Sequence, residues 1–206
     1  MIAVYGTRMS ALPPLQTLLS SLPCAWLEAW KEAHPAALKN EEQARRSLGG
    51  LYLLQYADVR GTLRYEKHGR PYLAEKETDF NITHTKTHIF CAVTDGKGAR
   101  VGLDAESLFH RAVSDRNALV ARWFSDEERT AFALAPTQET FLRIWTRKEA
   151  LVKYSGAGMR ALRKTDTVLE ERNSAVCFAE YRVDDLLVTL CHCPTDRPPK
   201  EIRILS

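Results

Sequence analysis

Two carboxylates lie two residues apart in residues 101–106 (VGLDAE). The alternation of apolar and polar residues predicts a strand in which Asp104 and Glu106 share one face, opposite their apolar neighbours. Carboxylates on one face repel each other unless a positive charge lies between them. A hard cation such as Mg²⁺, which takes oxygen ligands, supplies such a charge. On these residues alone, the alternative that both carboxylates simply face water stays open.

A third carboxylate follows in a segment with helical spacing. Trp145, Glu149 and Lys153 are four residues apart, so they form one ridge of a helix. A Glu and a Lys at this spacing usually form a surface ion pair, but a Trp on the same ridge favours burial. We therefore expect Glu149 and Lys153 to line a cleft at the edge of the core. There Glu149 would be a third metal ligand and Lys153 a fixed positive charge for a phosphate.

Three segments of the N-terminal half carry hydroxyl, imidazole or guanidinium groups, which are phosphate ligands. They are residues 45–46 (RR), 69–72 (GRPY) and 80–85 (FNITHT). His84 ends an apolar strand, and Arg70 lies beside a rigid turn where a planar cation could hold or stack on a nucleotide. Each segment also has an ordinary interpretation, as a structural histidine, a surface turn or a pair of solvent-facing arginines.

The positive charge is concentrated in one stretch. Residues 143–164 contain seven Lys and Arg residues and a single carboxylate, in a chain whose total net charge is +3. Such a local excess favours an anionic ligand or an acidic partner. A solvated helix face is the alternative interpretation.

The elements that position these residues occur in runs. Helices are predicted over 22–33 and 40–57, and strands around 2–5, 63–65, 80–83, 88–94 and 101–106. In the second half, Ser125 and Glu128 form a capping box for one helix, and a second helix runs from Thr137 to about Tyr154. A hairpin over 176–183 and 186–193 and a last strand over 202–205 follow. This grouping predicts an α+β fold.

Composition excludes several classes of protein. The 206 residues are 45% hydrophobic and 27% charged, which is globular and excludes a disordered chain, a collagen or a coiled coil. No apolar run approaches the roughly 20 residues of a transmembrane helix, and no signal peptide is recognisable, so we expect a cytoplasmic protein. The five cysteines are expected to be reduced thiols, and residues 191–193 (CHC) to belong to a strand rather than to a zinc site.

Taken in order, these segments resemble the surfactin-type 4′-phosphopantetheinyl transferases. The blocks that carry the resemblance are specific as a set, and they are residues 45–50, 69–72, 80–85, 101–106, 123–128 and 145–158. The chain has Arg70 where the family often has Lys, Thr83 and Thr85 where it has Ser, and Ala105 where it has a branched apolar residue. The first three keep a charge or a hydroxyl, and none of the four removes a group that the reaction needs.

The resemblance implies a pseudo-dimer of two similar α+β halves, residues 1–98 and 99–206, with the active site in the cleft between them. It implies transfer of the phosphopantetheine arm of coenzyme A to a serine of an acyl or peptidyl carrier protein, with release of 3′,5′-ADP. Catalysis would rest on Glu149, Lys153 and Asp104, and Mg²⁺ would be held by Asp104, Glu106 and Glu149. The residues that would contact or border coenzyme A are Arg45, Arg70, Pro71, Tyr72, Thr83, His84, Thr85 and Lys153.

The same resemblance implies a monomer that recognises the acidic helix of a carrier, without nucleic acid or membrane as a partner. Two other functions stay open. One is a non-catalytic coenzyme A or anion-binding module of the same fold, although all three carboxylates are present. The other is a metal-dependent nuclease or phosphohydrolase, although the chain shows no aromatic-studded nucleic-acid surface. The sequence does not choose between acyl and peptidyl carriers, or between Glu149 as base, metal ligand or both.

Overall fold

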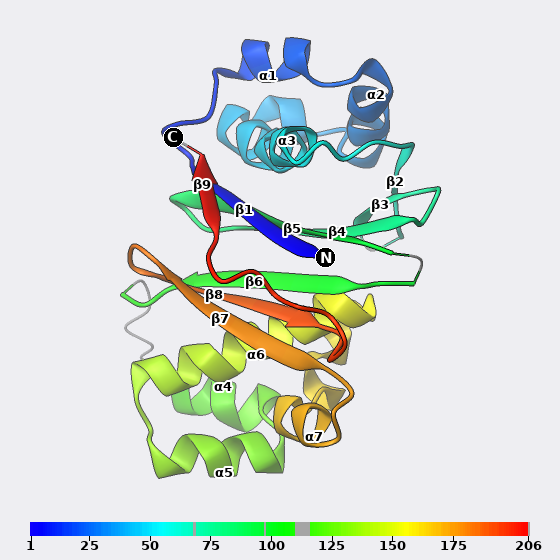
Figure 1. Cartoon of the computed structure of the whole chain (residues 1–206). Coiled ribbons are helices and arrows are strands. Elements are labelled where there is room, and N and C mark those ends of the chain that lie inside the picture. The colour runs from blue at the N-terminus through cyan, green and yellow to red at the C-terminus, as the bar shows by residue number, and fades with distance from the viewer. Residues whose placement is uncertain (68, 97, 110–115, 206) are drawn as a thin grey trace. The chain divides into compact units, whose positions relative to one another are not determined.

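The computed structural model describes residues 1–67, 69–96, 98–109 and 116–205. They form two compact units, one made of Met1–Ala99 and Pro199–Ser206 and the other of Arg100–Pro198. Each unit contains both helices and a β-sheet (Figure 1), which confirms the predicted α+β class. Within the described ranges, no helix is both long enough and apolar enough to cross a membrane.

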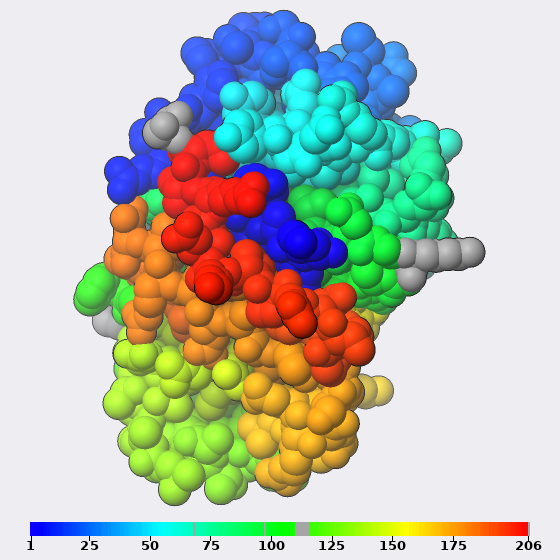
Figure 2. Space-filling model, viewed as in Figure 1, coloured from blue at the N-terminus to red at the C-terminus, as the bar shows by residue number. Residues whose placement is uncertain are grey.

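The first unit contains a four-stranded sheet. Its strand order is β4 (Thr78–His84), β5 (His88–Asp95), β1 (Ile2–Arg8) and β9 (Arg203–Leu205). Strand β9 is parallel to β1, whereas the other neighbours are antiparallel. The end of the chain therefore returns to the first unit, where the red C-terminal segment reaches the surface beside the blue N-terminal strand (Figure 2). A separate ribbon pairs β2 (Leu63–Tyr65) with β3 (Pro71–Leu73).

Helices cover this sheet. They are α1 (Leu15–Ser21), α2 (Cys24–Ala33), the short 3₁₀ helix η1 (Ala37–Lys39) and α3 (Glu41–Tyr56). Helix α3 begins after Asn40, whose side chain accepts a hydrogen bond from the Gln43 amide and so caps the first turn. Its apolar face, with Leu48 fully buried, packs against β5 and closes the core around Trp30 and Phe80.

The second unit contains a three-stranded antiparallel sheet and four α-helices in the part that the structure describes. Its strand order is β6 (Val101–Ser107), β8 (Leu186–His192) and β7 (Cys177–Val183). Its helices are α4 (Arg116–Trp123), α5 (Asp126–Leu134), α6 (Gln138–Ser155) and α7 (Thr167–Arg172), with the 3₁₀ helix η2 (Met159–Lys164) between the last two. The long helix α6 packs on β6 and β8 and so sets the position of the site described below.

The strongest local signals were predicted correctly. Helix α5 has the capping box of Ser125 and Glu128, and α6 ends at Gly156 in the left-handed conformation with φ 71°. Helix α4 was not predicted because none of its residues is buried, so it carries no clear apolar stripe. All five cysteines are free thiols. Of residues 191–193, which were expected in a strand, Cys191 and His192 lie in β8, whereas Cys193 follows its last residue.

Candidate functional site

Strand β6 and helix α6 bring the predicted acidic residues together in the second unit. Asp104 is only 3% exposed, and the Lys153 ammonium donates to its Oδ1 at 2.7 Å. The same ammonium donates to the Leu103 carbonyl oxygen at 3.0 Å, which fixes Lys153 against β6. Asp104 and Glu106 are both near enough to Glu149 to act on it through their charges. The structure thus places these three carboxylates and one ammonium in a single cluster.

The cluster has a marked effect on Glu149. Burial and the charge of Asp104 raise the pKa of Glu149 to about 8, and Glu106 acts in the same direction while Lys153 opposes them. A carboxyl with such a pKa can take up or release a proton near neutral pH. Burial, which is the largest cause, and the two neighbouring carboxylates thus outweigh the opposing charge of Lys153 in setting this pKa.

The donor set fits a hard divalent cation. Carboxylate oxygens are the ligands that Mg²⁺ takes, and a further positive charge would relieve the repulsion felt by Glu149. In the described ranges, no three His, Cys, Asp or Glu side chains are already arranged as metal ligands. The Lys153 ammonium supplies one positive charge beside Asp104.

Gly102 permits the close approach of β6 and α6 that forms the cluster. A Cβ atom at this position would lie 2.0 Å from the Ala150 carbonyl oxygen and 2.5 Å from the Tyr154 amide nitrogen. These are backbone atoms of α6, so no side-chain rearrangement could make room. The sequence signal for this role is a glycine inside a strand, which often marks a close backbone contact.

We expect Gly102→Ala to separate α6 from β6. The added methyl group would overlap backbone atoms, so helix α6 must move and carry Glu149 and Lys153 away from Asp104. Overpacking of this kind costs about 1–3 kcal/mol and more where backbone must shift. Urea unfolding should show a lower midpoint with an unchanged slope. An unchanged midpoint would contradict the assigned role of Gly102.

A buried ion pair supports α6 from its other side. The side chains of Lys148 and Glu128 are both 0% exposed, and Nζ lies 2.8 Å from Oε2. Glu128 also accepts hydrogen bonds from the Ser125 amide and from the amide and hydroxyl of Thr167. Lys148 donates in addition to the Thr165 carbonyl oxygen. The pair therefore ties α5 and α6 to the chain that leads into α7.

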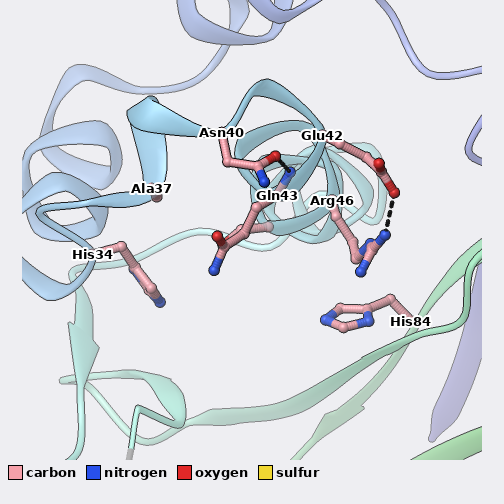
Figure 3. Close-up of a pocket in the computed structure, with 8 residues that line it drawn as sticks. His34, Ala37, Asn40, Glu42, Gln43, Arg46 and His84 are labelled. Carbon is pink, nitrogen blue, oxygen red and sulfur yellow. Dashed lines mark hydrogen bonds and ion pairs between the residues drawn. The ribbon is translucent and has the colours of Figure 1, made fainter.

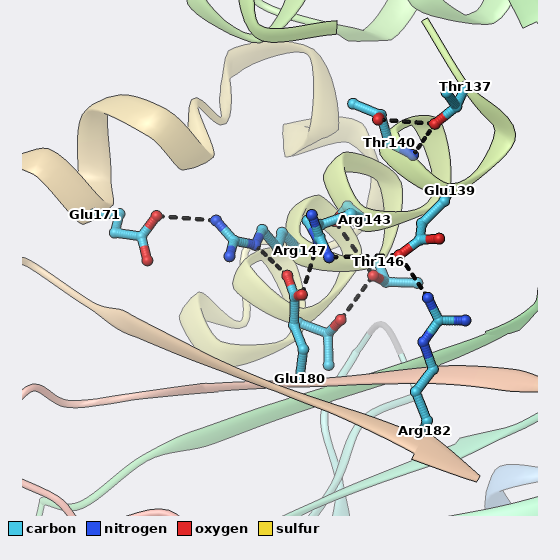
Figure 4. A network of polar contacts seen from close by, with 10 residues as sticks. Thr137, Glu139, Thr140, Arg143, Thr146, Arg147, Glu171, Glu180 and Arg182 are labelled. Carbon is cyan, nitrogen blue, oxygen red and sulfur yellow. Dashed lines mark hydrogen bonds and ion pairs between the residues drawn. The ribbon is translucent and has the colours of Figure 1, made fainter. Parts of the chain in front are cut away.

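Most of the basic stretch is neutralised within the second unit. Arg143 and Arg147 both pair with Glu180 of β7, in the network of Figure 4. Lys148 is buried against Glu128, and Lys153 pairs with Asp104. These four cations therefore have carboxylate partners within the second unit. Three cations of residues 143–164 are exposed and form no ion pair with any described residue. They are Arg160, Arg163 and Lys164.

The first unit has a polar cavity at the N-terminal end of α3 (Figure 3). Its volume is about 440 Å³, and it is lined by His34, Ala37, Asn40, Glu42, Gln43, Arg46, Ser47 and His84. The His34 ring is stacked on Trp30, and its Nδ1 lies 3.0 Å from the Trp30 carbonyl oxygen. Arg46 forms an ion pair with Glu42 at 2.5 Å. A guanidinium group and two imidazoles around one cavity at a helix N-terminus are suited to an anion.

The structure gives the two adjacent arginines different positions. Arg45 donates to the carbonyl oxygens of Leu12 at 3.0 Å and Met9 at 3.4 Å, so it ties α3 to the chain after β1. Arg46 lines the cavity instead. Consecutive residues project about 100° apart on a helix, so only one of the pair can face a given side. The register relative to buried Ala44 and Leu48 is the signal that distinguishes them.

Of the other predicted coenzyme A residues in this unit, His84 lines the cavity. Arg70 forms a half-buried ion pair with Asp79 at 2.9 Å and so connects the start of β3 to β4. Thr85 accepts hydrogen bonds from the amides of Thr87 and His88. The remaining three are strand residues, with Pro71 and Tyr72 in β3 and Thr83 buried in β4.

Comparison with known families shows what the part of the chain around this site is similar to. Residues 100–188 match the family model of the 4′-phosphopantetheinyl transferase superfamily. The matched span lies within the second unit and includes the Asp104, Glu149 and Lys153 cluster. The second unit therefore contains the part of the chain that is similar to this superfamily.

Curated relatives bear the same activity in their names. The chain is 31% identical over 132 residues to the 4′-phosphopantetheinyl transferase HetI of a Nostoc species, covering 61% of the chain and 53% of the relative. It is 28% identical over 168 residues to a 4′-phosphopantetheinyl transferase of Bacillus subtilis, covering 76% and 71%. It is 30% identical over 130 residues to the 4′-phosphopantetheinyl transferase AcpT of Escherichia coli K12, covering 62% and 64%. The chain thus spans about half to seven tenths of these relatives' length.

Proposed function

We propose that this chain is a 4′-phosphopantetheinyl transferase of the surfactin type, which modifies a serine of an acyl or peptidyl carrier protein. The observation that carries the proposal is the cluster of Asp104, Glu149 and Lys153 inside the span that matches the superfamily model. The surfactin type is supported by the blocks in the first unit, because the resemblance includes residues 45–50, 69–72 and 80–85 as well as the second unit.

The proposed reaction is a phosphoryl transfer. The serine Oγ attacks the phosphorus attached to pantetheine, the bond from that phosphorus to the bridging oxygen breaks, and 3′,5′-ADP leaves with the electron pair. The serine proton must pass to a base, and the carboxylate form of Glu149, with a pKa of about 8, suits that role. Such transfers depend mainly on positioning and on neutralising charge. The fixed ammonium of Lys153 provides part of that neutralisation.

We further propose that Asp104, Glu106 and Glu149 hold a Mg²⁺ ion. The ion would supply positive charge at the diphosphate that Lys153 alone does not provide. The support is the chemistry of the donor set, three carboxylates of which Glu149 has a raised pKa because of burial and the nearby charges of Asp104 and Glu106.

In the first unit, we propose that Arg46 and His84 hold a phosphate group of coenzyme A. Arg46→Ala should raise the KM for coenzyme A about tenfold, because a charge-assisted hydrogen bond contributes about 1.5–3 kcal/mol. Arg45→Ala should instead lower the thermal midpoint, since Arg45 binds backbone carbonyls of its own unit. Steady-state kinetics with thermal denaturation of both variants checks this contrast. A raised KM for coenzyme A in Arg45→Ala but not in Arg46→Ala would instead assign the phosphate contact to Arg45.

The decisive experiment is intact-mass spectrometry of an apo carrier protein incubated with this protein, coenzyme A and Mg²⁺. A phosphopantetheine-sized gain that disappears with EDTA is the expected result. Binding of coenzyme A without any gain on acyl and peptidyl carriers would instead favour a binding module. Release of phosphate without a carrier would favour a phosphohydrolase.

A further inference from the structure

The 3₁₀ helix η2 presents a positively charged surface. Arg160, Arg163 and Lys164 are exposed, and none forms an ion pair with another residue in the described part of the chain. Met159 beside them is 54% exposed. We refer to these four residues as the η2 patch. It differs from the arginines of α6, which Glu180 already neutralises.

Buried contacts and hydrogen bonds fix the backbone of the η2 patch. Side chains three residues apart eclipse each other in a 3₁₀ helix, so Arg160 and Arg163 lie side by side. Leu162, only 2% exposed, anchors η2 in the core. The Thr165 hydroxyl donates to the Ala161 carbonyl oxygen at 2.9 Å, and the buried Lys148 holds Thr165 in turn. A surface ordered in advance loses little entropy when a partner binds.

Among the residues that the structure describes, no carboxylate forms an ion pair with the patch. Asp166, the next carboxylate along the chain, caps α7 by accepting a hydrogen bond from the Leu169 amide. Helix α4, which packs against η2, contributes exposed Arg122 and has no Asp or Glu. The patch therefore combines several cations with one flexible apolar side chain.

We propose that the η2 patch docks the acidic helix of the carrier protein, an inference that rests on the proposed transferase function. Exposed cations bind a single small anion weakly in water. An amphipathic acidic helix instead presents several carboxylates at spacings of three and four residues, together with an apolar ridge for Met159. Because η2 packs against α6 and follows it closely in sequence, docking here brings the carrier to the helix that bears Lys153.

The test is a charge-reversal series in the full chain. The variant combines Arg160→Glu with Arg163→Glu, and the matched control combines Lys31→Glu with Arg172→Glu, which reverses two exposed cations on other helices. Transfer to an apo acyl carrier protein is measured with coenzyme A and Mg²⁺ at low and high salt. We expect the patch variant to raise the carrier KM at least about tenfold at low salt, with a weaker salt dependence. The KM for coenzyme A and kcat should not change.

The control should alter the carrier KM by no more than about twofold. An unchanged carrier KM in the patch variant, or equal effects in variant and control, would overturn the docking site while leaving the transferase function intact. A wild-type chain that transfers nothing would reject the proposed function and the docking site together. Thermal denaturation confirms folding, and if the Glu variant unfolds, the Arg160→Gln and Arg163→Gln pair should still raise the carrier KM.

Discussion

Replacing Glu149 by glutamine should lower the turnover of phosphopantetheine transfer by at least about 100-fold, because general-base assistance alone contributes about 10²–10⁴ in rate. The amide cannot accept the serine proton, and it replaces a charged oxygen in the proposed Mg²⁺ site. Glutamine has nearly the same shape, so the positions of Asp104 and Lys153 should persist. Single-turnover transfer to an apo carrier, followed by intact mass, measures the effect.

Stability provides the control for this variant. Burial and the charge of Asp104 disfavour the ionised form of Glu149, so its folded pKa is higher than its unfolded pKa. A neutral glutamine removes that unfavourable ionisation above neutral pH, and the metal-free variant should melt no earlier than the wild type there. Glu32→Gln, on an exposed position of α2, should leave turnover unchanged. Near-normal turnover in a folded Glu149→Gln protein would reject both the base and the metal-ligand role.

The cluster around Glu149 was predictable because its signals are local. The four-residue spacing of Trp145, Glu149 and Lys153 fixes one helical ridge, and the alternation around Asp104 fixes one strand face. The cap at Thr137 and the stop at Gly156 delimit the helix within the sequence itself. These local signals do not show how helix α6 packs on strand β6, and only the structure gives that packing.

Features that depend on distant residues could not be predicted in this way. Lys148 belongs by sequence to a basic stretch, yet its burial follows from Glu128, which lies 20 residues away along the chain. The helical register separates Arg45 from Arg46, but the partners of Arg45 are carbonyl groups that lie 33 and 36 residues away along the chain. Gly102 likewise has its role only because Ala150 and Tyr154 pack on it. A residue's charge indicates what it can bind, but its three-dimensional neighbours determine whether it faces solvent.

Lys148→Met should be among the most destabilising single substitutions in the second unit. It leaves the Glu128 carboxylate fully buried without its ammonium partner, and breaking one side of a buried pair costs about 3–5 kcal/mol. Glu128→Gln should cost less, because the amide oxygen can still accept from Thr167 while Lys148 keeps the Thr165 carbonyl. In the double variant no charge stays buried, so it should recover part of the loss, a coupling that urea unfolding of all four proteins measures. If the double variant instead loses the sum of the two single losses in unfolding free energy, Lys148 and Glu128 do not interact directly. Lys148→Met should also loosen the chain from Thr165 to Thr167, because Lys148 and Glu128 hold this connection to α7.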